Sequence, residues 1–287
     1  AGVHLHRAFG FGETDATDPF LLFDDFRNDV PAHYKQGFPW HPHRGIETIT
    51  YVLRGEVDHG DSLGNTGTLG AGDVQWMTAG GGIMHEEMPG PVEGRMYGFQ
   101  LWVNLPAKLK MMRPRYQEIT LNQIPEVKRE DGTKIRIIAG TVDGVEGPVT
   151  EIAADPTYLD VTIPPNGSFR QPISRGHASF AYLFEGSGRF ATAQEEDRTV
   201  APPHLIVFDD GDYVEVRAAE AGARLLLISG KPLGEPIARY GPFVMNTKEE
   251  IRQALKIDDY VYVLELGRNR FEGPVEDFTD LKKAFWV

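Results

Sequence analysis

Two short stretches of the sequence each carry a pair of candidate metal ligands spaced two residues apart. His41 and His43 form the first pair, and His85 and Glu87 form the second. On an extended strand, residues two apart point to the same face. If the two strands are neighbours in a sheet, three imidazoles and one carboxylate converge on one point. Imidazole suits iron, copper, nickel and zinc, and an added carboxylate with open coordination positions favours non-haem Fe(II).

Glu47 is a second candidate for the carboxylate ligand. Residues 46–54 are rich in β-branched and aromatic side chains, which predicts a strand. Along that strand Glu47 has the same parity as His43. If no bulge intervenes at Pro42 or Gly45, Glu47 faces the interior of a barrel together with the histidines. The residues alone therefore leave Glu47 and Glu87 as alternatives.

Three further histidines near the N-terminus are ligands by type. They are His4, His6 and His33. No second ligand pair lies near them in the sequence, so we expect them on solvated surfaces.

Composition excludes several classes of protein. The 287 residues include no cysteine, which rules out disulfides, thiolate metal ligands and cysteine nucleophiles. The net charge of −13 argues against binding to nucleic acid or an anionic membrane, because both are polyanions. No hydrophobic run is long enough to span a bilayer, and no signal-peptide pattern is present. We expect a soluble cytoplasmic protein, or a nuclear one if the source is eukaryotic.

The elements that must position these ligands are mostly strands. Strand patterns cover residues 3–8, 19–26, 46–54, 74–77, 95–105, 134–139, 157–163, 178–185, 204–208, 213–217 and 224–229. Residues 58–70 indicate a hairpin or surface loop, and residues 106–130 a connector. The triple glycine at 80–82 predicts room beside the metal or its substrate. One helix is expected at 246–255, capped by Asn246 or Thr247. This pattern favours β-sandwiches or barrels.

An internal repeat divides the chain. Residues 51–55 resemble 182–186, and residues 72–76 resemble 211–215. Two similar barrels are therefore expected, with predicted domains at 1–130, 131–240 and a helix and tail at 241–287.

The second copy of the repeat lacks the candidate ligands. The positions that match His41, His43, His85 and Glu87 are occupied by Pro172, Ser174, Arg224 and Leu226. His177 and His204 are isolated there. Only the first barrel is therefore expected to bind metal.

Four stretches together resemble the pirin family of the cupin superfamily. They are residues 41–48, 72–80, 82–89 and 242–247. The resemblance covers nearly the whole chain, except that Tyr260 to Leu266 and Phe285 to Val287 match nothing that we can place. It implies an all-β bicupin, with two antiparallel β-sandwich barrels of the jelly-roll type in tandem and a C-terminal helix.

The resemblance also implies a metal centre. Carried over, its ligands are His41, His43, His85 and Glu87, whereas the broader cupin pattern uses the position of Glu47. The implied metal is Fe(II), with Cu, Ni, Mn, Co or Zn as alternatives. Arg44 and Glu47 would then orient the imidazoles, as ligating histidines usually require.

Two functions follow from the resemblance. Bacterial members resemble quercetin 2,3-dioxygenases, which open a flavonol ring with O₂ and release carbon monoxide. The partners would then be O₂ and a small aromatic chelating substrate, with Glu87 as the base and Phe38, Trp40 and Trp76 as candidate pocket walls or core residues. The alternative is an iron-dependent redox-sensing regulator that binds a protein, either as a transcriptional co-regulator or on a metabolic enzyme.

Overall fold

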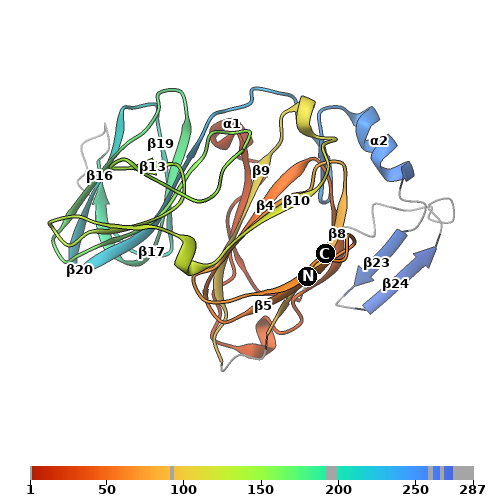
Figure 1. Cartoon of the computed structure of the whole chain (residues 1–287), viewed down its shortest axis with the longest axis horizontal. Coiled ribbons are helices and arrows are strands. Elements are labelled where there is room, and N and C mark those ends of the chain that lie inside the picture. The colour runs from red at the N-terminus through yellow and green to blue at the C-terminus, as the bar shows by residue number, and fades with distance from the viewer. Residues whose placement is uncertain (1, 91–93, 192–198, 258–260, 266–267, 274–287) are drawn as a thin grey trace. The chain divides into compact units, whose positions relative to one another are not determined.

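The computed structural model describes residues 2–90, 94–191, 199–257, 261–265 and 268–273. The chain forms two compact units (Figure 1). The first comprises residues 1–7, 24–118 and 234–287, and the second comprises residues 8–23 and 119–233. The domain boundaries at residues 130 and 240 stay a prediction.

Two antiparallel sheets contain most of the strands of the first unit. In spatial order, the six-stranded sheet contains β1 (His6–Phe9), β2 (Phe20–Asp25), β9 (Tyr97–Asn104), β4 (Ile46–Arg54), β7 (Val74–Thr78) and β10 (Arg115–Ile119). The four-stranded sheet contains β3 (Phe38–His43), β8 (Ile83–Pro89), β5 (Val57–Asp61) and β6 (Thr66–Leu69). Residues 58–70 therefore form a hairpin, as predicted.

Side chains that meet across the two sheets show that the sheets face each other. Thr50 of β4 and Gln100 of β9 both donate hydrogen bonds to Glu87 of β8. Trp102 of β9 lies edge-on against His43 of β3. Along β8 the side chains at Ile83, His85 and Glu87 are buried and those between them are less so, because alternate residues point to opposite faces.

The second unit is an eight-stranded arrangement. Its strands are β11 (Glu126–Lys128), β12 (Lys134–Ala139), β15 (Thr157–Ile163), β20 (Tyr213–Gly230), β17 (Ala178–Phe190) and β18 (Thr199–Val200), with β16 (Ser168–Pro172) paired to β20 and β19 (His204–Phe208) paired to β17. Its core consists of aliphatic residues that alternate along paired strands, such as Leu159 and Val161 on β15 and Leu225 and Leu227 on β20. This unit carries the predicted all-β pattern.

One strand prediction is wrong in the second unit. Residues 213–217 and 224–229 are not two strands but parts of the single 18-residue strand β20. Gly222, which lies between the two predicted strands, has φ +73°. It lies where the pairing with β17 shifts register around Gly186, so a bulge takes up the irregularity without ending the strand.

Residues 106–130 contain more structure than a connector. They hold β10 and β11 and the short 3₁₀ turns at Ala107–Leu109 and Leu121–Gln123. Three other short elements are the helix α1 (Thr14–Thr17), a 3₁₀ turn at Pro31–His33 and the hairpin β13 (Thr141–Val142) to β14 (Val145–Glu146). The prolines and charged residues of 106–130 gave no strand pattern, because the strands there are short and lie at sheet edges, where proline is tolerated.

The predicted C-terminal helix is α2 (Lys248–Ile257), preceded by the hairpin β21 (Ala238–Tyr240) to β22 (Phe243–Met245). Thr247 caps α2, because its hydroxyl accepts the Glu250 N–H while the Glu250 carboxylate accepts the Thr247 N–H. The hairpin β23 (Val261–Glu265) to β24 (Arg268–Gly273) follows. Of the two stretches that match no pirin motif, Tyr260, Leu266 and residues 285–287 lie outside the described residues.

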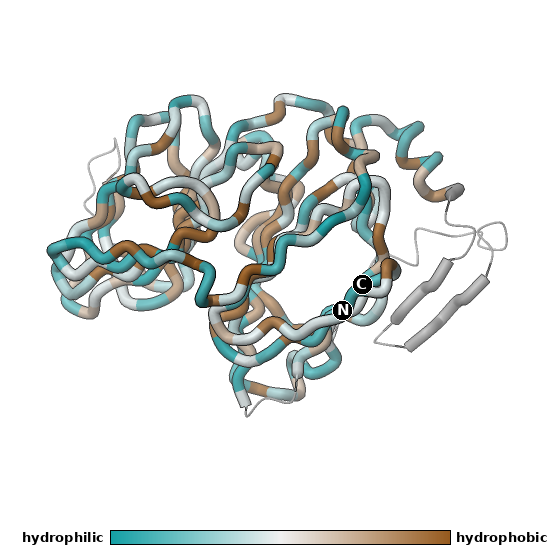
Figure 2. Tube along the Cα trace, in the orientation of Figure 1, coloured by the Kyte–Doolittle hydropathy of each residue, from teal (hydrophilic) through white to brown (hydrophobic). Residues whose placement is uncertain are grey.

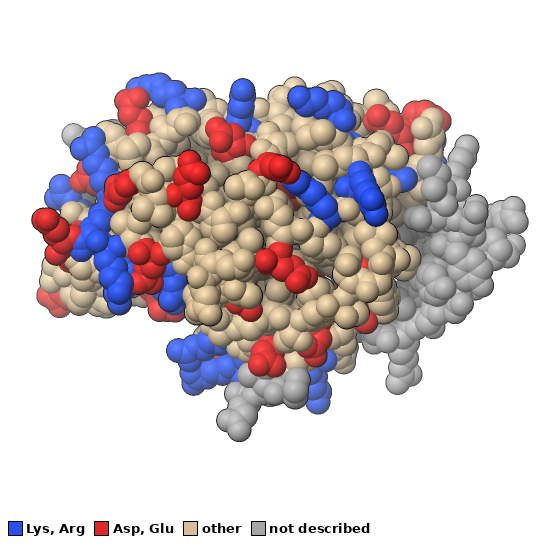
Figure 3. All heavy atoms as spheres, in the orientation of Figure 1, with Lys and Arg blue, Asp and Glu red and all other residues tan. Residues whose placement is uncertain are grey.

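Hydropathy alternates along the strands of both units (Figure 2). Among the described residues, no helix is long and apolar enough to cross a membrane. On the face drawn in Figure 3, acidic and basic side chains are interspersed and form no single basic patch.

Candidate metal centre

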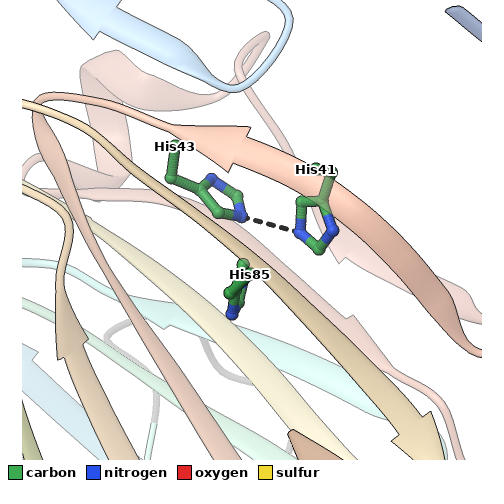
Figure 4. A group of neighbouring side chains, drawn as sticks. All are labelled: His41, His43 and His85. Carbon is green, nitrogen blue, oxygen red and sulfur yellow. Dashed lines mark hydrogen bonds between the residues drawn. The ribbon is translucent and has the colours of Figure 1, made fainter. Parts of the chain in front are cut away.

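Three imidazoles converge where β3 pairs with β8 (Figure 4). His41 and His43 lie on β3, and His41 is directly opposite His85 in the antiparallel register. One nitrogen from each ring lies within 4.8 Å of the others. The two-residue spacing therefore places the His41 and His43 rings on one face of β3, as expected. The pairing of β3 with β8 places His85 beside them.

The nitrogen positions fit a shared cation. His41 Nε2 lies 3.0 Å from His43 Nε2. Two nitrogens that each bind one metal at about 2.1 Å and at right angles are about 3 Å apart. Both ring nitrogens of His85 are buried and have no hydrogen-bond partner among the described residues. Buried polar atoms are rarely left unpaired, so the donor set fits a metal ion.

Burial keeps these imidazoles neutral. It lowers the pKa of His41, and it lowers the pKa values of His43 and His85 well below the ordinary range. The neighbouring imidazoles lower the last two further, whereas Glu87 opposes the shift at His41. The neutral ring is the form that binds metals.

The ring orientations are fixed by groups that the sequence did not indicate. His41 Nδ1 lies 2.8 Å from the carbonyl oxygen of Pro39, an arrangement common at ligating histidines. The indole of Trp102 meets the His43 ring edge-on, with centroids 4.9 Å apart. The alternating sequence pattern of residues 95–105 places Trp102 and Gln100 on the same face of the predicted strand. It does not show which residues that face contacts.

Glu87 lies on the same face of β8 as His85 and is 3% exposed. Its Oε1 accepts a hydrogen bond of 2.6 Å from Thr50 Oγ1, and its Oε2 accepts one of 3.3 Å from Gln100 Nε2. The carboxylate is not part of the group of three converging imidazoles. Its role as fourth ligand stays a prediction.

Glu47 does not share the histidine face. The chain turns at Gly45, where φ is +75°, and passes from the four-stranded to the six-stranded sheet. This irregularity reverses the parity, so Thr50 and not Glu47 meets Glu87. Glu47 accepts a 2.7 Å hydrogen bond from Thr78, and burial raises its pKa.

Arg44 and the triple glycine serve the backbone around the site. Arg44 Nε donates to the carbonyl oxygen of Gly81 at 2.6 Å. A Cβ on Gly80 would lie 2.2 Å from the carbonyl oxygen of Met112. Gly80 therefore makes room for the segment around Met112, and not for the metal or its substrate as expected.

A buried lysine ties three segments together beside the histidine strand. Lys110 Nζ donates to the carbonyl oxygens of Gly45 and Val244, at 2.9 and 3.0 Å, and to Oδ1 of Asn104 at 2.7 Å. The Val244 N–H donates in turn to the carbonyl oxygen of Arg44. β22 is thereby fixed to the turn that follows His43. The sequence pattern of residues 106–130 did not indicate that Lys110 would be buried or would join these segments.

A largely apolar cavity extends from Glu87. Its volume is about 20 Å³, which is room for about one water molecule. Its walls are formed by Val3, Phe26, Tyr34, Phe38, Thr50, Val57, Glu87, Pro89, Met96 and Gln100. Of the three candidate wall aromatics, Phe38 lines it, Trp40 is 40% exposed and Trp76 is fully buried in the core.

The remaining histidines do not form a second group of three or more converging ligands among the described residues. His4 and His33 stack on each other, and His177 lies 3.8 Å from Asp155. At the position matched with His85, Arg224 makes a 2.7 Å ion pair with Asp160.

Comparison with known proteins agrees with this architecture. The Pirin family model matches residues 2–103, and the Pirin C-terminal cupin domain model matches residues 158–261. A Pseudomonas aeruginosa protein named "Putative quercetin 2,3-dioxygenase" is 45% identical over 262 residues, which cover 89% of this chain and 90% of that protein. Human pirin is 42% identical over 257 residues, which cover 88% and 86%.

A solved structure matches over most of its length as well. The crystal structure of a quercetin 2,3-dioxygenase from Acinetobacter baumannii superposes with a TM-score of 0.81 at 35% identity, covering 90% of each chain. The two β units and the histidine cluster define a bicupin. Within that class, the chain belongs to the pirin family.

Proposed function

We propose that this protein is a metal-dependent dioxygenase that opens the ring of a flavonol such as quercetin with O₂ and releases carbon monoxide. One observation carries the proposal: three imidazoles, two of them buried, converge near Glu87, and a small apolar cavity is lined by that same residue. The names of the Pseudomonas and Acinetobacter proteins support the reaction type.

His41, His43 and His85 would hold the metal, with Glu87 as the proposed fourth ligand. The proposed metal is Fe(II), because imidazole with a carboxylate suits it, and Cu, Ni, Mn, Co and Zn are alternatives. When bound, the metal would supply a Lewis acid that lowers the pKa of the substrate hydroxyl, together with a reaction centre for O₂.

Glu87 is proposed as the base for that hydroxyl. Thr50 and Gln100 each hold one of its oxygens, so the carboxylate is fixed in orientation where the cavity ends. A carboxylate within hydrogen-bond reach of a hydroxyl can accept its proton. Phe38, Met96 and the other apolar side chains around the cavity would exclude water from the neighbourhood of Glu87.

The test is oxygen uptake by Fe(II)-reconstituted protein with quercetin, run beside metal-free protein and a His43→Ala variant. The expected result is uptake with carbon monoxide release that requires both metal and His43. If the protein binds metal stoichiometrically and shows no oxygen uptake with quercetin, the result contradicts the proposed dioxygenase activity and favours the redox-sensing regulator.

A further inference from the structure

A second pair of metal-binding side chains begins one strand away from the proposed ligands. His59 of β5 is directly opposite Glu87 of β8 in the antiparallel register, so the two side chains point to the same face of the sheet. The His59 side chain is 3% exposed, and its Nε2 lies 3.0 Å from Oε1 of Glu118 on β10. The Glu118 side chain is 48% exposed. The polar lining of the barrel therefore continues from Glu87 to a carboxylate at the surface.

The contact between His59 and Glu118 is not a hydrogen bond. Nε2 of His59 is buried and has no hydrogen-bond partner among the described residues, although the Glu118 oxygen is 3.0 Å away. The oxygen therefore does not lie along the direction of the ring N–H. Buried polar atoms are rarely left unpaired, so this nitrogen is open to a ligand.

A shared cation fits this geometry. Two ligand atoms that bind one metal at about 2.1 Å and at right angles are about 3 Å apart. The metal then lies on the axis of the ring nitrogen, and the carboxylate oxygen lies about 45° away from that axis. The short separation and the missing hydrogen bond are thus both expected of a ligand pair. Imidazole nitrogen and carboxylate oxygen together suit divalent zinc, nickel and iron.

Neighbouring residues orient the pair and leave space beside it. Gln75 is 2% exposed, and its Nε2 donates to the same Glu118 oxygen at 3.3 Å. The Tyr116 ring stacks on the His59 imidazole, with centroids 6.3 Å apart. Gly67 of β6 is opposite His59, and a Cβ there would lie 2.6 Å from His59 Nε2. The glycine therefore keeps the space next to this nitrogen free of a side chain.

We propose that His59 Nε2 and Glu118 Oε1 bind a second divalent transition-metal ion, separate from the ion held by His41, His43 and His85. Two protein ligands leave the other coordination positions to water, so the second ion is bound more weakly than the first. The inference does not depend on the proposed ring-opening reaction.

Equilibrium dialysis of the metal-free protein against Ni²⁺ tests the second site. The wild type is expected to bind one ion tightly and a second ion at higher free Ni²⁺ concentration. Glu118→Gln is expected to weaken the second ion about tenfold and to leave the first unchanged, because an amide oxygen carries no charge. His59→Ala is expected to lose the second ion alone, whereas His43→Ala is expected to weaken the first ion and keep the second. Glu118→Gln changes a half-exposed side chain, so it provides the test even if His59→Ala does not fold.

His177→Ala is the matched control. His177 Nε2 also faces a carboxylate, but it lies 3.8 Å from Asp155 Oδ2, which is too far for both atoms to bind one ion at about 2.1 Å and at right angles. This variant should bind both ions as the wild type does. A wild type that binds a single ion, an unchanged affinity for the second ion in either Glu118→Gln or folded His59→Ala, or loss of the second ion in His177→Ala would overturn the proposal.

Discussion

His41 and His85 lie directly opposite each other on β3 and β8, with ring centroids 4.4 Å apart. Residues far apart in the sequence thus become cross-strand neighbours, while His43 joins them from the same strand as His41. The site is therefore a property of strand register, and a one-residue slip would turn its side chains to the other face.

Replacing His43 with alanine should lower metal affinity at least tenfold, because one of three converging nitrogens is removed. The fold should survive, since the core of the second unit contains none of these histidines. Metal content after dialysis and circular dichroism measure the two effects. His177→Ala serves as control and should keep its metal. Stoichiometric metal in His43→Ala would refute the ligand assignment.

Glu87→Gln and Glu47→Gln form a matched pair that separates the two candidate carboxylates. Glu87→Gln should weaken metal binding about tenfold or more, because an amide oxygen carries no charge. Glu47→Gln should leave metal binding unchanged, because Glu47 accepts its hydrogen bond from Thr78 and does not share the histidine face. Burial also raises the pKa of Glu47, which makes its charged form less favourable. Metal titration of both variants measures this, and the reverse result would restore Glu47 as the ligand.

Lys110 should make stability depend on pH in the alkaline range. Burial lowers its pKa from 10.5 to about 8, with Glu235 and Glu250 opposing the shift. Between these two pKa values the unfolded chain binds a proton that the folded protein does not. The contribution of Lys110 to the free energy of unfolding therefore rises with pH across that window.

Lys110→Met removes this contribution together with three hydrogen bonds. The variant should be less stable than wild type at every pH, and the difference should widen from pH 8 to 10.5. Urea unfolding at a series of pH values measures the difference. A difference that stays constant with pH would show that Lys110 is not the titrating group.

Gly45→Ala and Gly64→Ala distinguish backbone strain from steric conflict. Both glycines have positive φ, +75° and +88°. A Cβ on Gly45 would lie 1.9 Å from the carbonyl oxygen of Val244, whereas a Cβ on Gly64 meets nothing within 4 Å. Gly64→Ala should cost about 1–3 kcal/mol of strain alone. Gly45→Ala should cost clearly more in urea unfolding, and similar losses would argue against close packing of β22.

The sequence was sufficient for features that depend on local periodicity. The two-residue spacing of His41 and His43 places both rings toward one point because β3 is extended there. The helix cap formed by Thr247 and Glu250 follows from a four-residue motif. The family resemblance supplied the choice between Glu47 and Glu87.

Features built from distant segments could not be predicted. Lys110 joins residues 45, 104 and 244, and no local pattern connects them. Trp102 contacts His43 only because the two sheets face each other. The parity argument for Glu47 required a regular strand through Gly45, and Gly45 instead adopts a positive φ where the chain passes between the sheets.

The contact of β22 with the turn after His43 also bears on biosynthesis. Chains are made from the N-terminus, so all the proposed ligands emerge from the ribosome long before residues 242–245. Until then Lys110 lacks one acceptor, and Arg44 lacks its backbone partners. A message truncated before the codon for Pro242 would yield a chain with every proposed ligand and an unsupported site. Stable metal capture is therefore expected only after residues 242–245 have been made.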